Sequence, residues 1–187
     1  MSLHAFIDES RRGGMYLLAA ALVRSDELAR TRSMMRGLSV AGARTVHFKH
    51  ERDSIKKDVA AALVSAKVRT RVYVGRGQAD VVREQGLHAA VRDLATIGLQ
   101  RLVLDTRTQD GNHSDRRIIR TALIEATGEA NKVAYVHLRA HEEPALWVAD
   151  AIAWCYGAGG DWRRRVGPIV EAVTDINCMS YQARPKI

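Results

Sequence analysis

LHAFIDESRRGGMYLLAAALV, residues 3–23, sets the fold, because it predicts two adjoining strands. Residues 3–8 predict a short strand that ends in an acid. Residues 15–23 form a continuous apolar run bounded by turn signals, which is typical of a central strand. The polar segment ESRRGG between them is rich in turn residues. We therefore expect a β-hairpin at the start of the chain.

The rest of the chain alternates helix and strand patterns. Asp26 is a candidate cap for a helix that runs to about residue 37, and the next helix is expected over residues 51–66. Residues 68–74 alternate between apolar and polar side chains, which is typical of a half-exposed edge strand. Further helices are expected over residues 79–97, 114–125 (capped by Ser114) and 144–160, and further strands over residues 102–105 and 132–138.

This order, three strands followed by helix, strand, helix, strand and helix, predicts an α/β fold with a partly parallel sheet. It matches the ribonuclease-H-like fold, a mixed five-stranded sheet with flanking helices. A helical insertion would lie between strands two and three, at about residues 24–67. The composition is 47% hydrophobic and 27% charged, with 3 prolines and no Ser/Gly-rich linker, so we expect a single domain over residues 1–187.

The sequence also indicates where the protein works. Cys155 and Cys178 have no zinc-ligand spacing and fit a reducing compartment. The first residues lack the basic segment and cleavage site of a signal peptide. The apolar stretch 144–160 is too short to span a bilayer and contains Asp150. We therefore expect a cytoplasmic protein without a membrane partner.

The charge balance favours a polyanionic partner. The net charge is +8, and the excess comes mainly from arginine, whose guanidinium suits bidentate contacts with phosphate. The alternative is that these arginines only cover solvated faces. They recur in four groups: Arg11 with Arg12, Arg69 with Arg71, Arg116 and Arg117 with Arg120, and Arg163 with Arg164 and Arg165.

Three aspartates stand where a ligand site is expected in such a sheet. Asp8 ends the first strand and Asp105 ends the fourth, and ligands of open α/β sheets bind beyond the carboxyl ends of strands. Asp150 is the single charged residue of PALWVADAIAWCYGAGG, residues 144–160, and an ionised carboxylate is rarely buried without a partner. Taken singly, the three aspartates have simpler explanations: a turn, a loop cap and an ion pair with a buried arginine. Together, in this order, they favour a metal site.

The chemistry of such a cluster suits Mg²⁺ or Mn²⁺. Carboxylates that meet in one crevice repel one another, and a cation offsets that repulsion. Both ions prefer oxygen ligands and complete their coordination with water and phosphate. Two such ions about 3.5–4 Å apart can activate an attacking water and stabilise the leaving oxygen of a phosphoryl transfer. We therefore expect Asp8, Asp105 and Asp150 to bind one or two of these ions.

Three short motifs give the chain a resemblance to a known family. HAFIDES at residues 4–10, LVLDTR at residues 102–107 and LWVADAIAW at residues 146–154 are similar to motifs of the bacterial family catalogued as domain of unknown function 3800, in the same order. The resemblance implies a fold similar to ribonuclease H and the resolvase nucleases. It also implies that the aspartates of the three motifs, Asp8, Asp105 and Asp150, are acidic metal ligands. The chain departs from the family where Arg11 and Arg12 replace the usual glycine.

Two glutamates are auxiliary candidates for a catalytic role. Glu9 directly follows Asp8, and on a straight strand it would point to the opposite face of the sheet. Glu143 precedes the last helix, where a carboxylate commonly caps the helix or complements its dipole, although it could also reach the acidic cluster.

Two polar segments hold further candidates. In HFKHERD, residues 47–53, the ligands for a zinc site are too few, and His47 and Lys49 are better placed near a phosphate path. Asp110 and His113 follow Asp105 in a polar loop, where we expect solvated side chains, with His113 as the alternative proton shuttle.

These features favour a divalent-metal-dependent nuclease, or a related phosphoryl-transfer enzyme, that acts on DNA or RNA. The alternative is a non-catalytic, ribonuclease-H-like nucleic-acid-binding or adaptor protein with a vestigial acidic cluster. The basic charge supports both hypotheses, so only the acidic cluster discriminates between them.

Overall fold

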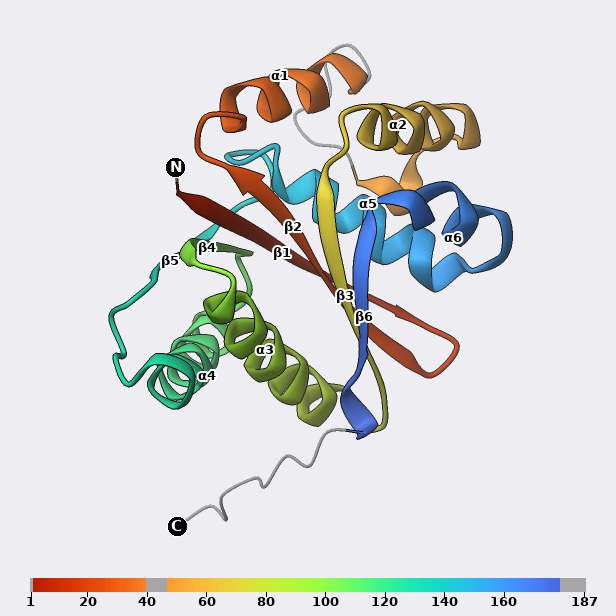
Figure 1. Cartoon of the computed structure of the whole chain (residues 1–187). Coiled ribbons are helices and arrows are strands. Elements are labelled where there is room, and N and C mark those ends of the chain that lie inside the picture. Colours follow the sequence, from red (N-terminus) through yellow and green to blue (C-terminus); the bar gives the residue numbers. More distant parts are fainter. Residues whose placement is uncertain (1, 40–46, 179–187) are drawn as a thin grey trace.

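The computed structural model describes residues 2–39 and 47–178 and has an α/β fold built on one mixed sheet (Figure 1). Within these ranges the sheet has six strands, in the order β5-β4-β1-β2-β3-β6. The strands are β1 (Leu3–Arg12), β2 (Met15–Arg24), β3 (Arg69–Arg76), β4 (Leu99–Asp105), β5 (Ala134–Leu138) and β6 (Val170–Asp175). The helices are α1 (Leu28–Leu38), α2 (Asp53–Ser65), α3 (Ala79–Thr96), α4 (Gln109–Thr127), α5 (Leu146–Ala158) and α6 (Gly160–Val166), with short 3-10 helices η1 (Phe48–His50), η2 (Gly167–Ile169) and η3 (Ile176–Cys178).

β1 and β2 form the predicted hairpin, but β1 is longer than predicted. Antiparallel pairing continues to Arg12, which lies opposite Met15. Gly13 and Gly14 make the turn with φ of 55° and 75°, the left-handed conformation that a two-residue hairpin turn commonly requires. Because so short a turn leaves no room for a loop, the polar residues ESRR extend the strand.

The strands that run parallel lie toward the two edges of the sheet. β4 pairs in parallel with β1 and with β5, so the first and fourth strands of the chain are neighbours. β6 pairs in parallel with β3. The expectation of five strands was therefore wrong, and β3 is an inner strand instead of the expected edge. β6 was missed because its six residues alternate between exposed and half-buried side chains and so contain no long apolar run.

Helices cover both faces of the sheet, and the side chains of β1 alternate between the two cores. Phe6 belongs to the core that includes α1, α2, α5 and α6, whereas its neighbour Ile7 belongs to the core under α3 and α4. Figure 1 shows the two groups of helices on opposite sides of the strands. The face that each acidic residue of β1 occupies therefore follows from its position in the strand.

Helices lie between β2 and β3, as expected, since α1, η1 and α2 occupy this part of the chain. Two predicted helix starts were wrong. Asp26 is not a cap but pairs with Arg24, and α4 begins at Gln109 because Thr108, rather than Ser114, caps it by accepting the N–H of Gly111 (3.2 Å). α6 was not predicted. None of the helices in the described residues has the length and apolar character needed to cross a membrane.

Candidate metal centre

The register of the two central parallel strands places Asp8 beside Asp105. Ile7 of β1 pairs with Leu104 of β4, so the next residue on each strand is one of the two aspartates. Neighbouring strands lie about 4.8 Å apart, and both carboxylates follow the strand alternation onto the face covered by α5. Asp8 and Asp105 also line one small cavity of about 50 Å³, together with Arg107.

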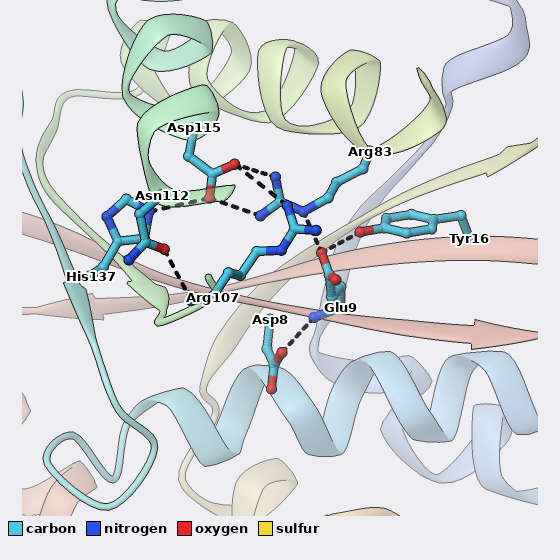
Figure 2. A network of polar contacts seen from close by, with 8 residues as sticks. All are labelled: Asp8, Glu9, Tyr16, Arg83, Arg107, Asn112, Asp115 and His137. Atoms are coloured by element: carbon cyan, nitrogen blue, oxygen red, sulfur yellow. Dashed lines mark hydrogen bonds and ion pairs between the residues drawn. The ribbon is translucent and has the colours of Figure 1, made fainter. Parts of the chain in front are cut away.

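Asp150 reaches the same place because α5 runs alongside β1 in the same direction. At the start of the two elements, Glu143 lies close enough to His4 for its charge to affect the pKa of that imidazole. Four residues of strand advance about 13 Å and seven residues of helix about 10 Å, which brings Asp150 level with Asp8. The Asp8 carboxylate points toward the light-blue helix on this side of the sheet in Figure 2.

The helical insertion contributes the third wall of the site. The backbone N–H of Phe48 in η1 donates a hydrogen bond to Oδ2 of Asp150 (2.9 Å). His47 lies near both Asp150 and Asp105, and its positive potential favours their ionised forms. The segment HFKHERD, singled out in the sequence for its histidines and Lys49, therefore does lie at the acidic cluster.

Burial and mutual repulsion shift the three carboxylates in one direction. Burial raises the pKa of Asp8 well above its ordinary value, and the charges of Asp150 and Asp105 raise it further. Burial also raises the pKa of Asp105, despite backbone N–H groups that act in the opposite direction. For Asp150 burial again raises the pKa, the Phe48 N–H opposes it, and the Asp105 charge adds to the rise. The three aspartates thus form one electrostatic cluster.

No ion pair neutralises this cluster within the part of the chain that the structure describes. Neither lysine nor arginine forms an ion pair with Asp8, Asp105 or Asp150 there. The two fully buried carboxylates of the fold behave differently, because Asp115 pairs with Arg83 and Glu143 pairs with Arg32. The ion pair with a buried arginine, the alternative explanation for Asp150, is not found among residues 2–39 and 47–178.

Glu9 lies on the opposite face of the sheet from Asp8, as the alternation of a straight strand predicts (Figure 2). Arg83 Nε donates to its Oε2 (2.6 Å), and the Tyr16 hydroxyl donates to the same oxygen. Glu9 therefore belongs to an ionic network with residues of α3 and α4, although its charge also raises the pKa of Asp8 and of Asp105.

Glu143 supports the start of α5 instead of joining the acidic cluster. Its side chain is 2% exposed, accepts the N–H of Ala145 (3.1 Å) and accepts Arg32 Nε (2.9 Å). It lies seven residues, about 10 Å of helix, before Asp150. The simpler of its two explanations, a helix-end carboxylate, describes these contacts.

Sequence reasoning missed the network that holds Glu9 and Arg107 beside the cavity. Arg83 spans from Glu9 to Asp115, His137 Nε2 lies 3.1 Å from Asp115 Oδ2, and Arg107 Nη1 lies 4.0 Å from Asp115 Oδ1 (Figure 2). Asp115 itself carried a usable signal, since it stands on the apolar face of α4 with Ile118, Ile119 and Ala122, where a lone carboxylate requires a partner.

A basic cavity adjoins Asp150 on the side of the hairpin. It measures about 510 Å³, and its lining residues are Glu9, Ser10, Arg11, Arg12, Lys49, Asp150 and Trp154. Arg12 stacks over Trp154 with 5.5 Å to the ring centroid, and Arg11 stacks over Tyr16 at 5.2 Å. The pair Arg11 and Arg12 thus lines an anion-sized space beside the acidic cluster.

The chemistry of the three aspartates suits a hard divalent cation, although their present positions do not form a closed ligand shell. All three are half-buried, so they remain reachable, and among the described residues no lysine or arginine forms an ion pair with them. In the described ranges, no group of three or more His, Cys, Asp or Glu side chains stands close enough to hold a metal ion. No protein-family model matches the chain, and no curated protein matches it. The assignment of a function therefore rests on the residues themselves.

Proposed function

We propose that this chain is a nuclease, or a related phosphoryl-transfer enzyme, that depends on Mg²⁺ or Mn²⁺. One observation carries the proposal: Asp8, Asp105 and Asp150 approach one another from three elements, and none has a cationic partner in the described residues. Three adjacent carboxylates without a cation raise the free energy of the folded chain, and a bound divalent ion relieves that cost.

The topology supports a ribonuclease-H-like fold for the proposed enzyme. The order β3-β2-β1-β4-β5, with the first three strands antiparallel and the next two parallel to β1, is the arrangement expected of that fold. β6 is an addition beside β3. The resemblance of FIDES and the two later motifs to the family of domain of unknown function 3800 supports the same three aspartates as ligands.

The three aspartates are held in two different ways in the proposed site. Asp8 and Asp105 extend from paired strands and are therefore held at a fixed separation, while the Phe48 N–H orients Asp150. A metal ion bound there would supply positive charge to a phosphoryl oxygen and a lowered pKa for an attacking water.

Arginine and lysine side chains flank the carboxylates and suit the phosphates of a substrate. Arg11, Arg12 and Lys49 line the cavity on the Asp150 side, and Arg107 lines the small cavity with Asp8 and Asp105. Guanidinium groups bind phosphate oxygens in bidentate geometry, so these residues would hold the backbone across the site.

The alternative function, a non-catalytic nucleic-acid-binding or adaptor protein, is favoured by a single observation. The carboxylates do not form a closed ligand group in the described residues, whereas the basic cavities need no metal to bind an anion. A protein of this kind would bind nucleic acid with a strong dependence on salt and would gain nothing from Mg²⁺.

Calorimetric titration of Mn²⁺ tests the proposal. We expect the wild-type protein to bind Mn²⁺ and Asp150→Asn to bind at least about tenfold more weakly, a loss of about 1.4 kcal/mol. Asp58→Asn, on an exposed position of α2, is the matched control and should bind like the wild type. Equal binding by wild type and Asp150→Asn would contradict the proposed site.

A cleavage assay tests the reaction. Single- and double-stranded DNA and RNA are incubated with the protein and Mn²⁺, with Asp8→Asn as the inactive variant and Asp58→Asn as the active control. Cleavage by all three proteins would point to a contaminating nuclease, and the absence of cleavage from a protein that binds Mn²⁺ would favour the alternative.

A further inference from the structure

A second basic groove lies away from the acidic cluster, between α4 and the edge strand β5. It measures about 510 Å³, and its lining residues are His113, Arg116, Arg117, Arg120, Thr121, Ile124 and Tyr135. No acid is among them. We call this feature the α4 groove. A space lined by three arginines and no carboxylate attracts anions.

The amphipathic pattern of α4 explains why these arginines face the solvent. Asp115, Ile118, Ile119, Ala122 and Leu123 are buried against the sheet. His113, Arg117, Arg120 and Ile124 follow one another at helical spacing on the exposed side. Arg116 and Arg120 are one turn apart, about 6 Å along the axis. The groove therefore presents a row of positive charges instead of a single point charge.

The arginines of the α4 groove have no partner of their own. In residues 2–39 and 47–178, none of Arg116, Arg117 and Arg120 forms an ion pair, a side-chain hydrogen bond or a ring contact. Unpaired arginines on a concave surface keep their full hydrogen-bonding capacity for a ligand.

The other arginine triplet of the chain is engaged. Arg164 and Arg165 pair with Asp161, at 2.7 Å in the case of Arg165 Nε. Arg163 donates to the Tyr156 carbonyl oxygen (3.0 Å) and stacks on its ring. The two arginine triplets thus have the same composition, but only the triplet of the α4 groove has all its guanidinium groups available for a ligand.

We infer that the α4 groove binds the sugar–phosphate backbone of a nucleic acid and guides it toward the three aspartates. This inference rests on the proposed function and names the path of its substrate. Arg116, Arg117 and Arg120 would contact phosphates, while the exposed side chain of Ile124 and the ring of Tyr135 offer apolar surface to a sugar or base.

The order of residues along the chain connects the groove with the candidate metal centre. Asp105 ends β4, Arg107 follows and lines the cavity that contains Asp8 and Asp105, and α4 then starts at Gln109. His113, in the second turn of α4, lies at the end of the groove nearest to these residues in sequence. The groove and the three aspartates lie on opposite faces of the sheet, so a backbone along α4 would have to pass the edge of the sheet where Arg107 lies between Asp105 and the start of α4.

Binding of a labelled oligonucleotide of about 20 nucleotides tests the inference. Fluorescence anisotropy is measured in EDTA, between about 50 and 200 mM salt, with the single strand and with its duplex. The groove variant is Arg116→Gln with Arg117→Gln and Arg120→Gln. The matched control is Arg163→Gln with Arg164→Gln and Arg165→Gln, which removes the same charge from the engaged triplet. Circular dichroism verifies that both variants are folded.

We expect the groove variant to lose at least tenfold in affinity and to flatten the slope of log K against log salt by about 2 to 3, while the control keeps the wild-type slope. If the groove variant loses more affinity for the single strand than for the duplex, a single strand occupies the groove, and the reverse result indicates a duplex. Equal losses of affinity in both variants would overturn the inference, because the general positive charge of the protein would then explain the binding. The inference would also fail if polyglutamate competed for the protein and its binding were equally weakened by the groove substitutions, because an acidic protein would then be the better ligand.

The metal-free conditions separate this test from that of the proposed function. If the groove variant binds like the wild type, the path is wrong and the Mn²⁺ titration still decides the metal site. If the wild type binds no nucleic acid at all, the inference and the nucleic-acid substrate both fail, and the same titration tells whether a metal-dependent phosphoryl-transfer site remains.

Discussion

Individual carboxylates in this chain are held in two opposite ways. Asp115 is completely buried, and its hydrogen bonds from His137 and Arg83 outweigh the effect of burial, so its pKa is lowered. Asp8 and Asp150 are half-buried without a cation, and burial raises their pKa values. The first arrangement stabilises the folded chain at neutral pH, and the second destabilises it.

Removal of one charge from the aspartate cluster should stabilise the metal-free protein. We expect Asp150→Asn to raise the melting temperature in EDTA at pH 7 by roughly 2–4 °C, the shift that about 1 kcal/mol produces in a chain of this size. The amide oxygen can still accept the Phe48 N–H, so the substitution removes repulsion and keeps the hydrogen bond. A melting temperature below that of the wild type would show that Asp150 has a stabilising partner.

The same cluster predicts a pH dependence of defined sign. Because the pKa of Asp8 is higher in the folded chain than its ordinary 3.8, the folded state binds more protons in the interval above that value. The free energy of unfolding therefore falls as the pH rises from about 4 through the raised pKa. The triple variant of Asp8→Asn, Asp105→Asn and Asp150→Asn should fall less over this interval in urea unfolding, and parallel pH profiles for the two proteins would contradict the prediction.

The opposite result is expected at Asp115. Replacement by asparagine removes one of the two carboxylates that pair with Arg83, which is 5% exposed, and leaves Glu9 as its remaining partner. Breaking a buried pair completely costs about 3–5 kcal/mol, so we expect a loss near the lower end of that range. Urea unfolding at pH 7 measures the loss. Asp58→Asn, on the exposed side of α2, is the control and should change the free energy of unfolding by less than about 0.5 kcal/mol.

At the scale of elements, the packing of β3 depends on the close approach of two side chains to the backbone of Gly75. A Cβ built on Gly75 would lie 2.5 Å from Cγ1 of Val82 and 3.4 Å from Cβ of Ile176, so α3 and η3 pack directly on the backbone of this strand. Val82 is short and branched and can move little without shifting α3.

Two glycine substitutions should therefore have opposite effects. Gly75→Ala is expected to destabilise the protein by about 1–3 kcal/mol through overpacking. Gly37→Ala in α1, where a Cβ would meet nothing within 4 Å, should stabilise it by about 0.5–1 kcal/mol through helix propensity. Chemical denaturation of the two variants measures both, and a neutral Gly75→Ala would show that α3 can retreat from β3.

Local signals predicted most of the elements but not their ends. Short stretches of sequence were enough for several elements. The glycines after β1 and the apolar run of β2 indicate the hairpin, and the apolar runs of β4 and α5 indicate a buried strand and a buried helix. The pairing of β6 with β3 and the early cap of α4 depend on residues that lack an apolar pattern, so tertiary contacts decide them. The α/β class with a partly parallel sheet followed from the alternation of helix and strand patterns, because chain connectivity allows few alternatives, but the position of β3 inside the sheet did not.

The whole molecule combines a net charge of +8 with a local cluster of negative charge, and a bound metal should affect its global stability. If Mn²⁺ binds only the folded chain, about 100 times its dissociation constant should add about 2.7 kcal/mol to the free energy of unfolding. Thermal unfolding with and without Mn²⁺ measures this gain. The triple aspartate variant should show none, and an equal rise in both proteins would place the ion elsewhere.

The distribution of free charge is the part of the candidate site that could not be predicted from the sequence. The four arginine groups look alike along the chain, but Arg69 pairs with Glu171, and Arg71 with Asp93. The partner of Arg69 lies about a hundred residues away, so only the folded sheet brings the two together. The three aspartates were easier to identify, because each interrupts or ends an apolar run.

The position of β6 near the end of the chain has a consequence for folding during synthesis on the ribosome. About 90 residues separate β3 from its outer neighbour, which at about 5–20 residues per second takes about 5 to 20 s to synthesise. During this time the nascent chain exposes the unpaired backbone of β3 to other chains and to chaperones. Arg69, Arg71 and Arg76 place positive charge along β3, and charged side chains on an open strand edge oppose its pairing with other chains.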